Sequence, residues 1–199
     1  MAPSTGRPLG FDRDVVLDAV VDTFWVHGYA GTTTSVLEAQ TGLSRSSLLN
    51  TFGPKDELCL AAVDRYQQRV DQWLVGPLLD GTEGVTEIEA FFVLLAQLKE
   101  SAPGSSGCLV VNLSAEMADI APGLRWRVER YSRSLQEGFE AALVRAEARG
   151  EVRPGDVPAR AAALVALAVT VNWTARSGTP EQARLVAASA SSLLSELSP

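Results

Sequence analysis

The sequence has few of the residues that build metal sites, disulfide frameworks or catalytic triads. It contains one histidine and two cysteines in 199 residues. Cys59 and Cys108 stand far apart and show no zinc-site or disulfide-framework spacing, so two reduced thiols are expected. His27 is the only imidazole, which excludes a Ser-His-Asp triad in the rest of the chain and leaves no Glu-x-x-His pair for a di-metal site. No glycine-rich loop follows a strand. The sequence therefore predicts neither an enzyme nor a bound metal or cofactor.

Signals for strands and for membrane segments are also lacking. No alternating apolar and polar stretch is bounded by hairpin turns, and no internal repeat is present. No apolar run approaches the length that crosses a bilayer, and Met1–Gly10 is too short and polar for a signal peptide. We therefore expect an all-α protein located in the cytoplasm.

Apolar residues at helical spacing, interrupted by glycine and proline, predict nine helices. The first helix spans Asp12–His27 and stops at Gly28, and the third begins after Ser44 and runs to about Thr51. A long helix from Lys55 to about Val75 should end or kink at Gly76-Pro77. The remaining predicted helices are Ser35–Thr41, Thr86–Lys99, Cys108–Asp119, Gly123–Arg149, Val157–Ser177 and Pro180–Leu197.

The two short helices near the N-terminus cannot be stable alone, because isolated helices under about 12–15 residues are marginal in water. They must pack on the first helix and on the start of the long one. We therefore divide the chain into a three-helix head (residues 1–54) and a larger helical body (residues 55–199), joined by the Lys55 helix.

The segment Thr32–Leu58 has the spacing of a helix-turn-helix motif, with three residues between its two short helices. Gly42 allows the left-handed conformation that ends the first helix, and Ser44 is a suitable N-cap for the second. An inner apolar face is predicted from Leu37, Leu43, Leu48 and Phe52. The alternative is an ordinary helical hairpin with a polar surface.

The outward face of the second short helix carries hydrogen-bonding side chains and no acid: Arg45, Ser46, Ser47, Leu49 and Asn50. Arginine pairs bidentately with guanine and asparagine with adenine in the major groove. Lys55 begins the next helix, where its charge and the free backbone N–H groups would meet a phosphate together. This pattern favours DNA binding.

The charge balance argues against DNA binding. The chain carries a net charge of −7, although basic character is the usual mark of phosphate contact. Residues 1–56 have a net charge of −2, from four basic residues (Arg7, Arg13, Arg45, Lys55) and six acidic ones (Asp12, Asp14, Asp18, Asp22, Glu38, Asp56). Four of these acids lie in the first helix, which can turn them away from DNA.

The same segment resembles the tetracycline-repressor-like (TetR/AcrR) regulators. The resemblance is carried by Gly6-Arg7-Pro8, Phe11-Asp12, Leu17-Asp18-Ala19, Phe24, Gly28-Tyr29, Thr33, Thr41-Gly42-Leu43-Ser44, Ser47-Leu48, Phe52 and Lys55, and more loosely by Gly107-Cys108-Leu109-Val110-Val111-Asn112. Leu49 stands where the family often has tyrosine, and Leu9 where it has a second basic residue. Glu38 and Val36 also depart from the family pattern.

The resemblance implies an Ω-shaped homodimer of nine-helix subunits that binds a palindromic operator. It also implies a repressor that a small-molecule effector releases. The residues expected to contact double-stranded DNA are Arg7, Thr33, Thr34, Ser44, Arg45, Ser46, Ser47, Leu49, Asn50 and Lys55. Dimerisation is expected through the last two helices, which carry small and aliphatic stripes: Ala161, Leu164 and Ala168 on one, and Leu185, Ala188 and Leu193 on the other.

The body would enclose the effector. The candidate ligand contacts are Trp73, Phe91, Phe92, Cys108, Asn112, Met117, Trp126, Tyr131 and Trp173. For each one singly, ordinary core packing is the commoner role. Cys108 is either a small core residue or a thiol activated at a helix N-terminus. Arg125, Arg127, Arg130 and Arg133 are expected to form a solvated face.

A different class of protein stays open beside the repressor. An interaction or sensor module that has lost DNA binding fits the acidic balance and Leu49 better.

Overall fold

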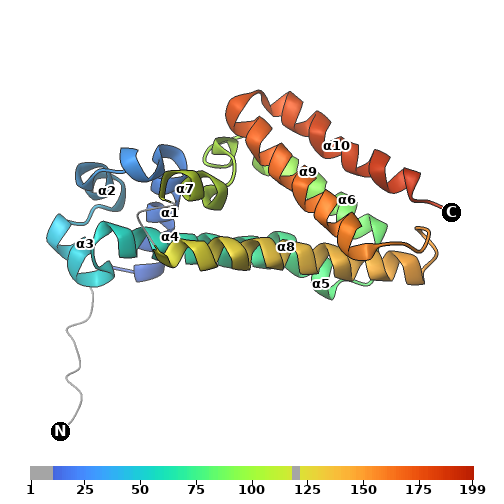
Figure 1. Ribbon diagram of the computed structural model, residues 1–199. Coiled ribbons are helices and arrows are strands. Elements are labelled where there is room, and N and C mark those ends of the chain that lie inside the picture. Colours follow the sequence, from blue (N-terminus) through green and yellow to red (C-terminus); the bar gives the residue numbers. More distant parts are fainter. Residues whose placement is uncertain (1–10, 118–121) are drawn as a thin grey trace, which may run out of the picture.

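The computed structural model of the chain describes residues 11–117 and 122–199, and these residues are arranged as packed helices (Figure 1). One end of the molecule consists of α1 (Arg13–Gly31), α2 (Thr34–Thr41) and α3 (Arg45–Phe52). The body contains α4 (Lys55–Val70), α5 (Gly76–Asp80), α6 (Val85–Leu98), α7 (Leu109–Met117), α8 (Pro122–Ala148), α9 (Val157–Ser177) and α10 (Pro180–Glu196). The predicted all-α class is confirmed.

The helix that begins at Lys55 does not end near Val75: of the two outcomes expected at Gly76-Pro77, an end or a kink, the structure excludes the end. A π-helical turn at Asp71–Val75 joins α4 directly to α5, and the helical run continues to Asp80. Counted as one, this run gives nine helices among the described residues. The N–H of Gly76 bonds to the carbonyl of Asp71, five residues back. Pro77, which has no N–H to donate, stands directly after this turn in the first turn of α5.

Gly28 bends α1 near its end, where the sequence predicted a stop. Its φ of 68° lies in the left-handed region, and one further turn follows as far as Gly31. Glu116 of α7 fills the space beside the bend, and its Oε2 accepts hydrogen bonds from the N–H groups of Tyr29 (2.8 Å) and Ala30 (3.2 Å). The bend therefore leaves two backbone donors free of the helix, and α7 satisfies them.

The acidic side of α1 lies against the basic side of α4. Asp18 accepts hydrogen bonds from Arg65 Nε (2.6 Å) and Nη2 (3.1 Å), and Arg69 lies 2.8 Å from the same carboxylate. Arg69 also approaches Asp22 at 3.5 Å. The hydrogen bond from Arg65 is the main cause that lowers the pKa of Asp18 below its ordinary value. Asp18 and Asp22 thus face the body, as the sequence required for a nucleic-acid-binding head, whereas Asp12 caps the exposed start of α1 and Asp14 is 72% exposed.

The body has an aromatic core between α6 and α8. Phe92 stacks on Phe139, and Phe91 meets Phe139 edge to face with ring centroids 4.8 Å apart. Two of the four arginines expected on a solvated face instead join α8 to α4: Arg127 and Arg130 both pair with Asp64, and Arg130 also bonds to Gln67. The expectation was wrong for Arg127, whose side chain is only 14% exposed because α4 supplies an acid that the local sequence of α8 does not show, whereas Arg130 pairs with the same acid and is still exposed.

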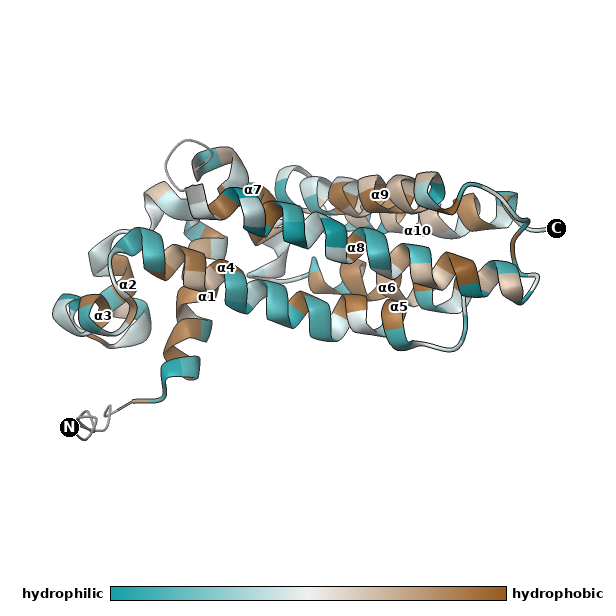
Figure 2. Ribbon diagram, turned by 60° about the horizontal axis from the view of Figure 1, so that its bottom comes forward, coloured by the Kyte–Doolittle hydropathy of each residue, from teal (hydrophilic) through white to brown (hydrophobic). Residues whose placement is uncertain are grey.

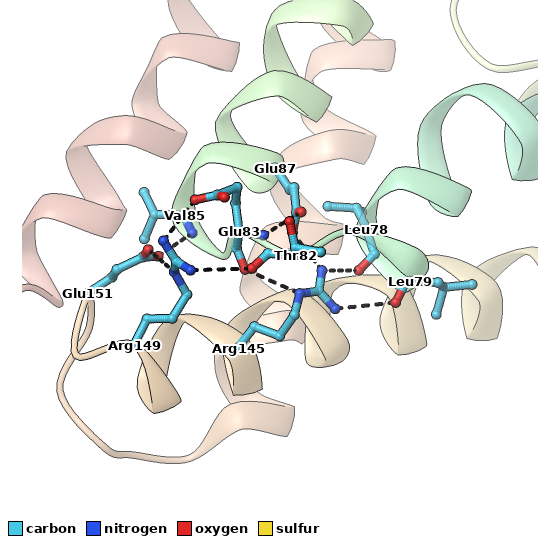
Figure 3. Close-up of polar contacts among 9 residues, drawn as sticks. All are labelled: Leu78, Leu79, Thr82, Glu83, Val85, Glu87, Arg145, Arg149 and Glu151. Atoms are coloured by element: carbon cyan, nitrogen blue, oxygen red, sulfur yellow. Dashed lines mark hydrogen bonds and ion pairs between the residues drawn. The ribbon is translucent and has the colours of Figure 1, made fainter.

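Two arginines at the end of α8 hold the loop between α5 and α6 (Figure 3). Arg145 forms an ion pair with Glu87 at 2.6 Å and donates to the carbonyls of Leu78, Leu79 and Glu83. Arg149 pairs with Glu83 and Glu151, and Glu151 accepts from the N–H of Val85. This network caps α5 and α6 with charged groups from one neighbouring helix.

Helix α9 is long and apolar enough, by length and composition alone, to cross a membrane, contrary to the expectation from the sequence. It packs against α8 and α10, and Figure 2 shows it as largely hydrophobic, whereas much of α8 is hydrophilic. Only 28% of its most apolar window is buried in the subunit. The apolar surface left open by α9 is a property of the isolated chain that its function must explain.

We expect Gly28→Ala to destabilise the fold by about 1–3 kcal/mol, because a side chain at this φ is strained. The added Cβ would also lie 2.3 Å from Oε1 of Glu116. Chemical denaturation measures the effect. Gly31→Ala is the matched control, since its Cβ would meet only His27 Cβ at 3.5 Å. Equal stability of the two variants would contradict the role of the bend.

Arg145→Met should lower the free energy of unfolding by about 3 kcal/mol, because it leaves Glu87 without its ion-pair partner and three carbonyls without a donor. Arg133→Met, on the exposed side of the same helix, should change it by less than about 0.5 kcal/mol. Thermal and urea unfolding report both values. A loss as small as that of the control would mean that the network does not stabilise the loop.

Candidate nucleic-acid interface and internal cavity

The predicted helix-turn-helix is present between α2 and α3. Three residues separate the helices, and Gly42 takes the left-handed conformation (φ 69°) with its N–H bonded to the carbonyl of Glu38. Ser44 caps α3: its Oγ accepts a hydrogen bond from the N–H of Ser47 at 3.3 Å. Thr33 caps α2 in the same way through Val36 N–H. The turn thus forms by the local chemistry that its sequence predicts.

The two helices are held by their inner faces. Leu37, Leu48 and Phe52 are buried, and Leu43 packs against them from the turn. Arg13 of α1 lies over the ring of Phe52 at 5.1 Å. Because the inner face holds the motif in place, the opposite face of α3 is not needed for packing. Helix α3 lies at the end of the molecule away from the C-terminus (Figure 1).

That outer face is solvent-exposed. Arg45, Ser46, Leu49 and Asn50 are exposed, and Ser47 is half-buried. Leu49 is a large apolar side chain with 52% of its surface open. Thr33, Thr34 and Ser44 are exposed beside it, whereas Arg7 lies outside the described residues. The candidate contact residues within the described part of the chain therefore gather around one helix.

Glu38 has a structural role at the turn. Its Oε1 accepts a hydrogen bond from the N–H of Arg45 at 2.7 Å. This bond satisfies one of the backbone donors left free at the start of α3. The acid that departs from the family pattern thus serves as an additional cap, supplied by α2.

Lys55 stands at the start of α4, close to the end of α3. Its Nζ lies 4.2 Å from the centre of the Tyr29 ring, and α4 has no side-chain cap. The Tyr29 hydroxyl donates to Asp56, and this hydrogen bond is the main cause that raises the pKa of Tyr29 to about 12. The position offers a cation together with backbone N–H groups that no side chain caps, which is the chemistry that holds a phosphate, but Asp56 and Glu57 lie in the same turn.

A cavity of about 630 Å³ lies where the head meets the body. Helix α1 contributes Asp22 and Trp25 to its lining, and α4 contributes Tyr66 and Arg69. The other walls come from α6, α8, α9 and the segment 101–104. Its volume is in the range of small-molecule sites, and its walls combine aromatic rings with a few polar groups.

The predicted ligand contacts divide between this cavity and other places. Trp73, Phe91 and Tyr131 line it. Phe92 packs in the aromatic core, and Asn112 donates to the carbonyl of Ser106. Trp126 lies on the surface under Arg127 and Arg130, and Trp173 is 68% exposed on α9. The side chain of Met117 lies outside the described residues.

Cys108 is buried beside the cavity between two tyrosines. The Tyr66 hydroxyl donates to its Sγ at 3.6 Å, and the thiol in turn donates to the Tyr131 hydroxyl at 3.4 Å. Burial is the main cause that raises the pKa of both tyrosines well above the ordinary value. These hydroxyls therefore stay protonated at neutral pH, and the arrangement favours the alternative of a small core cysteine.

Lys99 and Asn172 line the cavity but were not among the ligand contacts predicted from the sequence. Lys99 is 2% exposed, its Nζ donates to the carbonyl of Gly107 at 2.9 Å, and burial lowers its pKa to about 8. Asn172 lines the cavity through α9, and its Oδ1 is buried without a hydrogen-bond partner. A lysine next to the polar segment 100–107 resembles a surface residue, so only the tertiary structure reveals its burial.

The chain matches known proteins over most of its length. A family model for the tetracyclin repressor-like C-terminal domain matches residues 84–190, more than half of the chain. The HTH-type transcriptional repressor ComR of Escherichia coli is 34% identical over 156 residues, which cover 76% of this chain and 72% of ComR. The uncharacterised HTH-type transcriptional regulator YezE of Bacillus subtilis is 30% identical over 152 residues, 76% of this chain and 78% of YezE.

Solved structures show the same fold. A TetR transcriptional regulator from Chloroflexus aurantiacus is 29% identical, with a TM-score of 0.75 over 92% of this chain and 91% of that one. The TetR-family regulator CifR, a cysteine mutant complexed with 26-base-pair double-strand operator DNA, is 24% identical, with a TM-score of 0.77 over 92% of this chain and 97% of CifR. With the helix-turn-helix geometry and the matched body, these similarities establish that the chain belongs to the tetracycline-repressor-like family of transcriptional regulators.

Proposed function

We propose that the chain represses transcription by binding a palindromic operator through α3, and that a small molecule in the body cavity releases it. The observation that carries the proposal is an exposed α3 surface without an acid, held rigidly by a buried inner face. The structure of CifR with operator DNA supports the same use of this fold. The family consists of regulators, and we assign no catalytic residue and a cytoplasmic location.

The contacts to DNA divide by chemistry. Arg45 and Asn50 can pair bidentately with base edges, and the exposed Leu49 offers an apolar contact to a thymine methyl group. Phosphate contacts come from the remaining described residues of the predicted set: Thr33, Thr34, Ser44, Ser46, Ser47 and Lys55. Arg7 would reach the minor groove from the N-terminal arm.

The functional unit is a homodimer. The α9 stripe expected from the sequence, Ala161, Leu164 and Ala168, is buried inside the subunit and is not available to a second copy. Four other apolar residues of α9 are exposed and follow one stripe at helical spacing: Ala162, Ala166, Val169 and Trp173. Leu185 and Leu193 are exposed on α10. Small residues allow helices to approach closely, so a second copy can pack on this surface as a four-helix bundle. Two heads then face successive major grooves, about 34–36 Å apart.

The cavity is the proposed effector site because its walls belong to both parts of the chain. A ligand there touches Trp25 of α1 and Tyr66 of α4, the two helices that connect head and body. A ligand can shift the protein only toward a state that it binds better. We propose that the occupied cavity favours a different tilt of α4, which changes the separation of the two heads. The head (residues 1–54) and the body (residues 55–199) therefore differ in their proposed roles, although they pack against each other around the cavity.

Alanine substitutions should separate the base contacts from the phosphate contacts. Arg45→Ala and Asn50→Ala should relax sequence preference and cost about 1–3 kcal/mol on the selected operator. Lys55→Ala should weaken binding to all DNA sequences by the same factor. It should also reduce the slope of log affinity against log salt concentration by about one. The measurements are selection from random duplex DNA and fluorescence anisotropy at stated salt concentrations.

Arg125→Ala, an exposed residue of α8, serves as the control for these variants. If the three head variants bind like the control, the docking face is wrong. A wild-type protein without any salt-dependent DNA affinity would instead support the interaction module.

Ala166→Arg should convert the dimer to a monomer, because it places an unpaired charge in the α9 stripe at a cost of several kcal/mol. Size-exclusion chromatography with light scattering measures the change, and operator affinity should fall with it. Ala90→Arg, exposed on α6, should leave the dimer intact. A dimeric Ala166→Arg protein would exclude this stripe from the interface.

A further inference from the structure

The cavity lining contains a buried lysine that no carboxylate of the described residues contacts. Lys99 Nζ bonds to the carbonyl of Gly107 and lies 5.5 Å from the centre of the Trp25 ring. Among the described residues, no carboxylate lies within ion-pair distance of it. The other two charged residues of the lining, Asp22 and Arg69, pair with each other at 3.5 Å. Of the three charged side chains in the lining, Lys99 is therefore the one without an opposite charge within ion-pair distance.

A second polar group in the same lining lacks a partner. Asn172 is 7% exposed, its Nδ2 donates to the carbonyl of Ala168 at 2.8 Å, and its Oδ1 has no donor. Buried polar atoms without a partner are rare, because each costs about 1–3 kcal/mol. Lys99 and Asn172 both line the cavity, and Gly107 joins them: its carbonyl bonds to Lys99, and a Cβ on it would lie 2.9 Å from the backbone oxygen of Asn172.

An apolar residue at either position would give a more stable subunit. A buried ammonium is costly unless an anion accompanies it, and a buried amide oxygen is costly unless it accepts a hydrogen bond. Both costs disappear if a bound molecule supplies the missing groups. The aromatic rings of Trp25, Tyr66, Phe91 and Tyr131 define the rest of that molecule as apolar.

We propose that the effector is an aromatic or otherwise apolar organic anion whose negative group pairs with Lys99. The inference rests on the proposed function, in which this cavity is the effector site. An O–H or N–H group on the same molecule meets Asn172 Oδ1. Anion binding draws Lys99 toward the ligand and away from Gly107. The carbonyl of Gly107 also accepts a hydrogen bond from the Nε1–H of Trp25 in α1. The ligand therefore acts on a contact that includes the head.

Two fluorescent probes with one skeleton test the charge. 1-Anilinonaphthalene-8-sulfonate is an aromatic anion, and N-phenyl-1-naphthylamine is the same molecule without the sulfonate. Lys99→Met should weaken binding of the sulfonate by about tenfold or more and change binding of the neutral probe by less than about twofold. Lys55→Met, the same substitution at the only other lysine, should leave both affinities unchanged.

The pH dependence gives an independent readout. A bound anion raises the pKa of Lys99, which is about 8 in the free protein. The affinity for the anionic probe is therefore at its maximum below pH 8, where Lys99 is protonated, and falls above it. The other titratable and charged groups that face this region are Asp22, Arg69, Cys108, Tyr66 and Tyr131. The decline should be about tenfold per pH unit at most, and it should be absent for the neutral probe and for Lys99→Met.

A cavity-filling variant separates the inference from the proposed function. Ala168 is buried and lines the cavity, so Ala168→Phe should block both probes. If it does so while Lys99→Met weakens both probes equally or neither, the cavity binds ligands but the anion assignment is overturned. If Ala168→Phe leaves both affinities unchanged, the cavity is not the site and both proposals fall. Circular dichroism checks folding, and Ala168→Leu replaces a variant that does not fold.

Discussion

Asp18 of α1 accepts hydrogen bonds from Arg65 and Arg69 of α4, and this contact fixes where the acids of the head lie. An acidic chain can present an acid-free surface to DNA only if its carboxylates are held elsewhere. Here α4 holds Asp18 and Asp22, because Arg65 and Arg69 recur at the same spacing of four residues, and Glu38 is bonded to the N–H of Arg45. The head is therefore neither electrostatically nor sterically independent of the body. Its net charge of −2 describes composition, whereas binding depends on the position of each charge.

The same pairing places α1 so that its other side closes the cavity. Trp25 follows Asp22 by three residues, and both line the cavity while α4 contributes Tyr66 and Arg69. Helix α7 completes the connection: Gly107, just before it, accepts hydrogen bonds from Trp25 and Lys99, and Glu116 near its end holds the bend at Gly28. A change in the cavity therefore reaches the head through two contacts of α1 with α7 and its preceding segment, and through α4. Allosteric coupling needs such contacts with different energies in the two states.

Local chemistry made much of the fold predictable from the sequence. The bounds of α2, α3, α9 and α10 were predicted to within one residue, because caps such as Ser44 and Thr179 and breaks such as Gly42 act within one helical turn. The continuation of α4 through Pro77 was not predictable, since a π-helical turn leaves no distinct sequence pattern. The exposed face of α3 could be predicted from periodicity, but the burial of Lys99 and Asn172 could not. Their burial depends on α1, α7 and α9 meeting in space, and no single segment encodes that meeting.

Energetically costly features are concentrated at the cavity and are absent from the helix-turn-helix. The helix-turn-helix obeys local rules throughout: capped helices, a glycine at the left-handed position and a buried inner face. The cavity instead gathers a buried ammonium and an amide oxygen without a donor. Sequences that specify one structure satisfy such groups, and exceptions are expected where function requires them. A subunit optimised for stability alone would replace Lys99 and Asn172 with apolar residues and fill the space between Trp25 and Tyr131. A molecule bound as we propose would supply the anion that Lys99 lacks and the donor that Asn172 lacks.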